Sequence, residues 1–317
     1  LNGIDNNVNV IDFINQTAYV IGPSLEAIGE MKVLTSGYNA EYGRGAGGVV
    51  NVTLKSGTND LHGAVCDFLQ NDKLNANSWA ANRIGRAKGA MRQNQFGAAL
   101  GGPLIKNRTF WFIDYDGVRQ RVGGAAYTAT VPRAAFKNGD FSSLLGKVLG
   151  NDPLGRPVAE GQIFDITTTR QIAGGVWVRD PFPGNLIPPQ NWDPVGKKLI
   201  DFYPEPNQNL TTRVPGSNYF RLRDTQKTQK DQGDARIDHR LTDKDSLFGT
   251  LSWSESLKEM PPPLPGPLDG TGFSAVTQND QPRSAMASWS RVWNPTILTE
   301  TRLAYTRLVT ARTQYEP

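Results

Sequence analysis

Residues 36–57 place the strictest limits on the fold, because the chain changes there from glycine-rich to strand-like within a few positions. Residues 41–48 read Glu-Tyr-Gly-Arg-Gly-Ala-Gly-Gly, with four glycines in six residues around Arg44. A backbone of this kind adopts positive φ angles and approaches other groups closely. Apolar and polar residues then alternate over 49–54, which predicts a β-strand, and the turn-forming run 55–60 ends it.

Gly43, Gly45 and Gly48 also form the pattern G-x-G-x-x-G, which is typical of dinucleotide-binding proteins. That function requires a helix directly after the third glycine, with its N-terminus facing a pyrophosphate. The residues that follow here are β-branched and alternating instead. We therefore expect no nucleotide site and no cofactor at this position.

Composition narrows the class of protein further. Hydrophobic residues make up 38% of the 317 positions, whereas Gly (33) and Pro (21) are frequent, which indicates β structure with many turns. The net charge of +4 arises from interleaved acids and bases, so the sequence does not indicate a nucleic-acid partner.

The few cysteines and histidines exclude several kinds of site. The single cysteine, Cys66, excludes a disulfide within the chain and a cysteine-based zinc site. The two histidines, His62 and His239, are too few for a histidine triad. No run of eighteen apolar residues is present, but barrel strands need only about 9–11 alternating residues to cross a membrane.

One predicted strand alternates between large apolar side chains and carboxylates. Trp111, Ile113 and Tyr115 share one side of it, and Asp114 and Asp116 share the other. Such a strand suits a position between lipid and the wet interior of a barrel (the lumen), but a half-buried sheet of a soluble protein gives the same alternation. The two carboxylates lie about 7 Å apart, a spacing that inverting glycosidases also use, although polar lumen residues explain it without catalysis.

Several segments, taken in order, resemble TonB-dependent outer-membrane receptors, especially the large Oar-like and SusC-like receptors. Residues 41–52, followed by Lys-Ser-Gly-Thr-Asn and His-Gly, are similar to the end of a receptor plug where the first barrel strand begins. The other segments are Asn-Gln-Phe-Gly-Ala-Ala-Leu-Gly-Gly-Pro-Leu-Ile-Lys at 94–106, Thr-Phe-Trp-Phe-Ile-Asp-Tyr-Asp-Gly at 109–117, and those at 139–142, 181–188 and 234–249. The resemblance therefore covers almost the whole chain.

The resemblance implies a mainly β fold, made of the N-terminal strands of a transmembrane antiparallel β-barrel preceded by the C-terminal part of a small α/β plug domain. We expect the plug part at 1–60 and the N-terminal part of the barrel at 61–317, with about eight strands, against about 22 in a complete plugged transporter. Long loops are expected at 70–92, 119–228 and 257–281, and short turns at the other end of the sheet. Because the chain begins at Leu1 without a leader sequence, we expect it to be a piece of a longer receptor.

Two further expectations concern side chains and the plug. Leu251 and Trp253 should face lipid together with the three apolar side chains named above, whereas Thr250 and Ser252 should face the lumen with the two carboxylates. In the plug part, Pro and Ser at 23–24 predict the start of a short helix that leads into a strand at 28–34.

Residues 41–48 are predicted to form a structural latch, where the plug backbone passes close to the inner barrel wall. The latch residues are Glu41, Tyr42, Gly43, Arg44, Gly45, Gly47 and Gly48. The Arg44 guanidinium is expected to pair with a lumen carboxylate such as Asp67, Asp114 or Asp116. The alternative is a solvated Arg44 beside glycines that form only a turn.

The resemblance implies active import of a nutrient through a plugged barrel in the cell outer membrane, and no enzymatic activity. The cargo would be a carbohydrate, a peptide-like compound or a chelate. Its partners would be outer-membrane lipid, a TonB-type periplasmic energy-coupling protein that binds a segment outside this chain, and a surface lipoprotein. The alternative from a different class is a soluble β-rich binding or adhesion module that recognises a glycan or protein through its Pro-rich loops.

Overall fold

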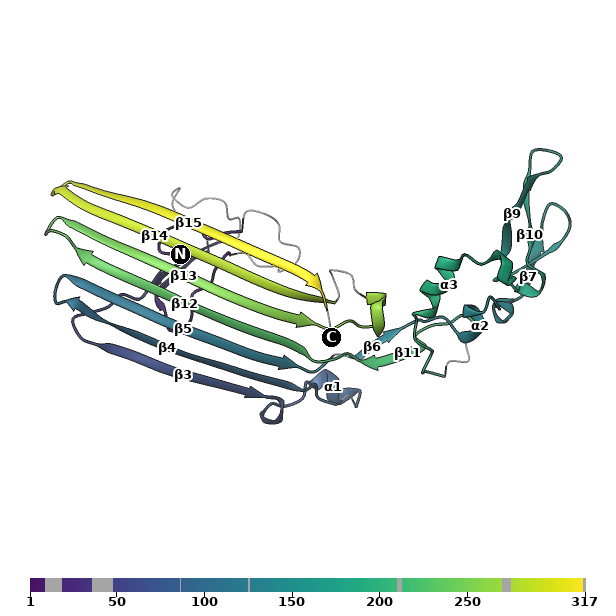
Figure 1. Cartoon of the computed structure of the whole chain (residues 1–317), viewed down its shortest axis with the longest axis horizontal. Coiled ribbons are helices and arrows are strands. Elements are labelled where there is room, and N and C mark those ends of the chain that lie inside the picture. The colour runs from purple at the N-terminus through teal and green to yellow at the C-terminus, as the bar shows by residue number, and fades with distance from the viewer. Residues whose placement is uncertain are drawn as a thin grey trace. The chain divides into compact units, whose positions relative to one another are not determined.

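A computed structural model describes residues 1–8, 19–35, 48–85, 87–124, 126–209, 213–269 and 275–315. Its main feature is an antiparallel sheet of seven strands in the order β15-β14-β13-β12-β5-β4-β3, so that neighbours in the chain are neighbours in the sheet (Figure 1). The strands are β3 (His62–Asn71), β4 (Met91–Ile105), β5 (Thr109–Val122), β12 (Gln226–Arg240), β13 (Asp245–Met260), β14 (Val276–Asn294) and β15 (Ile297–Gln314). The sheet thus contains one strand fewer than the expected number of about eight, because the other strands described in the chain pair in separate two-stranded sheets.

Short turns and long connections alternate along this sheet, as expected. The short turns at 106–108, 241–244 and 295–296 lie at one end of the strands, and the connections 72–90, 123–225 and 261–275 leave from the other. The expected loop boundaries were wrong by several residues, because the strands extend further into the long connections. Many of the added residues are polar on both faces, as at 119–121 and 226–228, so the alternation that marks a strand in the sequence is lost there.

The exposed face of the sheet is apolar and the buried face is polar, which is the reverse of the arrangement in a soluble protein. Ile113 and Leu251 are 48% and 61% exposed, whereas Asp114 is only 8% exposed. Tyr115 and Trp253 share the exposed face, on which Trp111 is half-buried, and Asp116, Thr250 and Ser252 share the buried face. Large apolar side chains therefore point outward and polar side chains point inward, which is the arrangement of a barrel that is surrounded by lipid.

The height of the apolar outer band also fits a membrane. On the outward side of β13, Asp245 and Glu255 are ten residues apart, and only uncharged residues lie between them. At about 3.3 Å per residue and a tilt of about 40°, that interval corresponds to a band about 25 Å tall, as in transmembrane barrels.

Arginines stacked on aromatic rings mark the edges of the band. At the edge nearer the long connections, the Arg119 guanidinium lies 5.6 Å from the Phe96 ring centre, and Arg283 lies 5.9 Å from that of Trp253. At the short-turn edge, Arg291 lies 4.3 Å from the ring centre of Trp293. Amphipathic side chains of this kind favour the interface between hydrocarbon and water.

The N-terminal segment packs on the inward face of the sheet. Its strands β1 (Ile28–Leu34) and β2 (Val49–Leu54) pair antiparallel, in agreement with the sequence. The helix expected to start at 23–24 is wrong: the chain makes one turn there, in which the Ala27 N–H donates to the Ser24 carbonyl over 3.1 Å. Strand β1 begins at the next residue and pairs with β2, so the helical start is not continued.

Residues 125–223 and 262–270 form a second compact unit. Its paired strands are β6 (Ala126–Ala129) with β11 (Tyr219–Leu222), β7 (Val148–Asn151) with β8 (Pro157–Ala159), and β9 (Phe164–Gln171) with β10 (Trp177–Pro181). Its helices are α2 (Ala134–Lys137), α3 (Pro194–Asp201) and the 3-10 turns η2 (Ser142–Leu144), η3 (Pro183–Asn185), η4 (Pro189–Asn191) and η5 (Gly266–Asp269). The side chain of Asp193 caps the N-terminus of α3 by accepting from the Gly196 N–H. Short helices η1 (Asp72–Leu74) and α1 (Trp79–Arg83) lie in the connection between β3 and β4.

No helix in the described ranges is long and apolar enough to cross a membrane.

Candidate functional site: the contact between the N-terminal segment and the sheet

Ser24 makes the central polar contact between the N-terminal segment and the inward face of the sheet. Its hydroxyl donates to Oδ2 of Asp114 on β5 and accepts from the Ala27 N–H over 3.1 Å. Asp114 lies directly opposite Asp234 on β12, and the Asp234 carboxylate accepts from the Ser252 hydroxyl on β13. Ser24, Asp114, Asp234 and Ser252 are all at least nine-tenths buried, so this contact excludes bulk water.

A second polar contact joins the end of β2 to β12. The Arg236 guanidinium forms an ion pair with Asp238, from Nη2 to Oδ1 over 2.8 Å and from Nε to Oδ2 over 2.9 Å. Its Nη1 donates to the Leu54 carbonyl over 2.8 Å, and the Ser56 hydroxyl donates to Asp238 over 2.7 Å. The guanidinium also lies 4.7 Å from the ring centre of Phe248. One arginine therefore connects three strands, and its charge is balanced where little water reaches it.

The apolar part of the contact lies between these polar groups. Leu1, Ile21, Ala27 and Leu54 of the N-terminal segment pack in one buried cluster with Ala99 and Phe112 of the sheet. Phe112 is 2% exposed, and removing a side chain of this size from water stabilises the contact by about 2–3 kcal/mol.

At Gly57 the backbone of the segment passes close to the backbone of the wall. A Cβ atom at this buried position would collide with the carbonyl oxygens of Trp111 and Gly102, which are paired across β5 and β4. Only a residue without a side chain fits here, because the colliding atoms belong to the sheet backbone.

The sequence-predicted site residues are only partly described. Residues 41–47 lie outside the described ranges, so the latch around Arg44 stays a prediction. Gly48 has φ 152°, and a Cβ there would lie 2.9 Å from the Leu34 carbonyl oxygen, so glycine is required where β2 begins.

The three carboxylates named as partners of Arg44 do not share a face. Asp114 and Asp116 both lie on the buried polar face, and Oδ2 of Asp116 accepts from Gln95 over 3.0 Å. Asp67 lies opposite Phe96 in the register and therefore points to the outer face, so the expectation that it is a lumen carboxylate was wrong. The error arose because a one-residue difference in register reverses the face.

Part of this contact could be predicted from the sequence. Arg236 and Asp238 lie on a strand whose alternation indicates a charged lumen face, so their inward position could be predicted. Ser24 has no comparable signal, because a serine after a proline is equally typical of a helix start. Among the described residues, no group of His, Cys, Asp or Glu is arranged to hold a metal ion.

The comparison with protein families agrees with this geometry. The model of a family described as "Outer membrane beta barrel domain" matches residues 53–317, which is most of the chain. The chain belongs to this family and is therefore part of an outer-membrane barrel, a class of membrane proteins rather than of enzymes. This result overrules the soluble module and the glycosidase as interpretations.

One curated relative is the TonB-dependent transporter Oar of Myxococcus xanthus. It is 32% identical to this chain over 96 residues, which is 29% of the chain and 9% of that protein. The match thus covers a small part of the relative.

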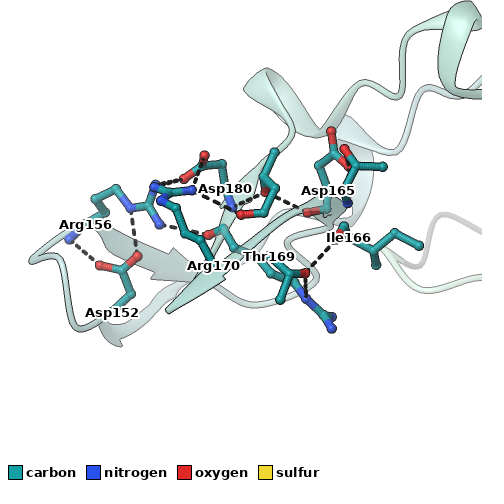
Figure 2. A network of polar contacts seen from close by, with 10 residues as sticks. Asp152, Arg156, Asp165, Ile166, Thr169, Arg170 and Asp180 are labelled. Carbon is teal, nitrogen blue, oxygen red and sulfur yellow. Dashed lines mark hydrogen bonds and ion pairs between the residues drawn. The ribbon is translucent and has the colours of Figure 1, made fainter. Parts of the chain in front are cut away.

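The second compact unit contains a separate network of charges at the β9–β10 hairpin (Figure 2). Asp180 accepts from Arg170 through both carboxylate oxygens, over 2.7 and 2.9 Å, and from Arg156 over 2.5 Å. Arg156 also binds Asp152 over 2.7 Å, so it connects the hairpin to the preceding turn. The guanidinium groups of Arg170 and Arg156 lower the pKa of Asp180 to about 2.

We expect this hairpin to open in acid through Asp180. Because the pKa is lower in the folded hairpin than its ordinary value of 3.8, the ion pairs stabilise the hairpin fully at neutral pH, and this contribution is lost as the pH falls from 3.8 through about 2. Hydrogen exchange of the β9–β10 amides should accelerate in that window. Asp180→Asn should exchange faster at pH 7 and lose most of the acid dependence; an unchanged pH profile in this variant would assign the transition to other groups.

Proposed function

We propose that this chain is the late plug and early barrel of a TonB-dependent transporter that imports a nutrient across the outer membrane. In this proposal residues 1–60 belong to the plug, residues 61–317 belong to the barrel, and the inward face with Asp114 and Asp116 lines the lumen. The observation that carries the proposal is the packing of the N-terminal segment on the polar face of a sheet whose other face is apolar. A transport barrel of about 22 strands needs such a segment, because its lumen is otherwise an open channel.

The contact is suited to release as well as to closure. It depends on a few polar groups, Ser24 against Asp114 and Arg236 against the Leu54 carbonyl, beside a small apolar cluster. A periplasmic partner that pulls on the plug would break these contacts one after another, whereas the seven-stranded sheet would stay intact. The partners in this proposal are a TonB-type energy-coupling protein and, at the cell surface, a lipoprotein.

A reversible cross-link tests whether the contact must open. In the full-length receptor with Cys66→Ser, the pair Ser24→Cys and Asp114→Cys places two thiols where the native side chains touch. Oxidation should stop uptake, and reduction should restore it. The assay is growth on a single limiting nutrient, which is an oligosaccharide, an oligopeptide or a ferric chelate. The nutrient is chosen so that deletion of the receptor impairs growth on it and deletion of the TonB-type protein does so too.

The single-cysteine variants are the controls for this experiment, because they carry the same substitutions without a cross-link. Full uptake by a completely cross-linked receptor would reject an opening at Ser24. Growth that is independent of the TonB-type protein on all three nutrients would reject energised import.

The latch at residues 41–48 is a separate part of the proposal. If its glycines let the plug backbone pass along the wall, Gly45→Val should loosen plug seating while the barrel still inserts. Sensitivity to large antibiotics should then rise, or uptake should fall, while the heat-modifiable mobility of the barrel on gels stays normal. A variant with unchanged uptake and sensitivity would leave only a turn at this position.

A further inference from the structure

The outward face of the sheet has a groove of about 730 Å³ across β12–β15. The groove forms where small residues lie between the larger side chains of Leu251, Leu303 and Tyr305. The small residues include Gly249, Ala285 and Ala287. The groove is lined almost entirely by carbon and lies within the apolar band, so its occupant in a membrane is a hydrocarbon chain.

Two arginines lie just beyond one end of this groove. Arg283 on β14 and Arg307 on β15 are directly opposite in the register, next to the pair formed by Ala285 and Tyr305. Both are exposed, and alternation places both on the outward side. Like charges directly opposite each other destabilise a sheet, so this pair requires a compensating group.

The protein supplies that compensation only in part. Arg283 donates through Nη1 to the carbonyls of Ser254 and Pro282, and its guanidinium lies 5.9 Å from the ring centre of Trp253. Arg307 has no ion-pair partner among the residues that the structure describes. Two arginines opposite each other on neighbouring strands can bring two guanidinium groups to the oxygens of one phosphate group, which they match in charge.

We propose that Arg283, Arg307 and the adjoining groove form a binding site for one phosphorylated lipid of the outer-membrane leaflet. The arginines lie at the band edge nearer the long connections, which is the cell-surface side of an outer-membrane barrel. The phosphate binds both guanidinium groups, and an acyl chain extends from there into the groove between Leu251 and Leu303. The site is on the lipid side of the wall and does not depend on import through the lumen.

The test measures lipid retained by the full-length receptor. The receptor is purified from its own outer membrane, exchanged extensively into mild detergent, and examined by native mass spectrometry for bound phosphorylated lipid. The wild type should retain about one such lipid per receptor, and Arg283→Gln/Arg307→Gln should retain at least about tenfold less, since each arginine near a membrane surface contributes to the attraction of anionic lipid.

Two further variants separate a built site from general charge. Arg291→Gln removes an outward arginine at the opposite band edge and should leave retention unchanged. Ala287→Phe fills the groove without changing charge and should lower retention as the double variant does. Heat-modifiable mobility on gels confirms that each variant is folded, and Ala287→Phe tests the site independently if the double variant does not insert.

Equal retention by the wild type and the folded double variant would overturn the proposal. An equal loss in Arg291→Gln, or full retention in Ala287→Phe, would show nonspecific ionic attraction and would also overturn it. So would release of the lipid by millimolar inorganic phosphate, because a free anion would then be the ligand.

Discussion

In the proposed transporter, a valine in place of Gly57 should detach the N-terminal segment from the barrel wall. The added Cβ would collide with the Trp111 and Gly102 carbonyl oxygens, which cannot retreat without breaking the pairing of β4 and β5. Overpacking against atoms that cannot move costs about 1–3 kcal/mol or more, so we expect the segment to yield and the sheet to stay intact. Sensitivity to large antibiotics should rise severalfold, and protease should cleave within residues 19–57, while the barrel keeps its heat-modifiable mobility.

Gly89→Val is the matched control for this substitution. Gly89 lies in the connection between β3 and β4, and a Cβ there meets no atom within 4 Å. This variant should behave as the wild type. If Gly57→Val retains full protease protection and an unchanged antibiotic sensitivity, the close approach at the wall does not hold the N-terminal segment.

Replacing Arg236 by Met should weaken the same contact by removing a charge. The substitution leaves the Asp238 carboxylate without its cation and the Leu54 carbonyl without a side-chain donor. Breaking a buried pair costs about 3–5 kcal/mol, and the side chains here are 12% and 21% exposed, so we expect a loss of about 2–4 kcal/mol. Hydrogen exchange of the β1–β2 amides in the full-length receptor measures this loss as faster local opening.

Arg302→Met provides a control with the same chemistry and less burial. Arg302 on β15 also pairs with a carboxylate two residues away, Glu300, over 2.7 Å, and donates to a carbonyl of the N-terminal segment, that of Gly3, over 3.2 Å. Its side chain is 35% exposed, so its loss should cost less than about 1 kcal/mol.

The double variant Arg236→Met/Asp238→Asn completes the design, because it removes both charges. It should recover part of the lost protection. Equal effects of Arg236→Met and Arg302→Met would show that burial of the ion pair does not matter.

The alternation of side chains was sufficient to predict the two faces of β5 and β13, but not the face on which Asp67 lies on β3. Side chains alternate along a strand with a period of two, and a carboxylate in hydrocarbon has a high energetic cost. These two facts place Ile113 and Leu251 on one side and Asp114 and Thr250 on the other. The same reasoning failed where both faces of a strand meet water, so the predicted strands ended too early at residues such as Val118 and Ser256. A short β-strand and a capped helix also share signals, which explains why the turn after Ser24 was predicted as a helix.

The candidate site was harder to predict than the fold. Contacts between segments far apart in the chain, such as Ser24 with Asp114, have no pattern in one sequence, because each residue fits its local element without the other. Gly57 is an intermediate case. Its place in a turn-forming run was evident, but the carbonyl groups that require a glycine come from strands that begin more than thirty residues later.

The strands are longer than the apolar band, so the barrel wall extends beyond the membrane. β14 has 19 residues, and seven of them, 276–282, lie beyond Arg283 on the side of the long connections. At about 3.3 Å per residue and the same tilt of about 40°, this part of the wall rises about 18 Å past the edge of the hydrocarbon. A full barrel built from such strands would have a raised collar standing in the hydrated sugar layer at the cell surface. Molecules too bulky to reach the lipid, including phage tail fibres and antibodies, would meet this collar first.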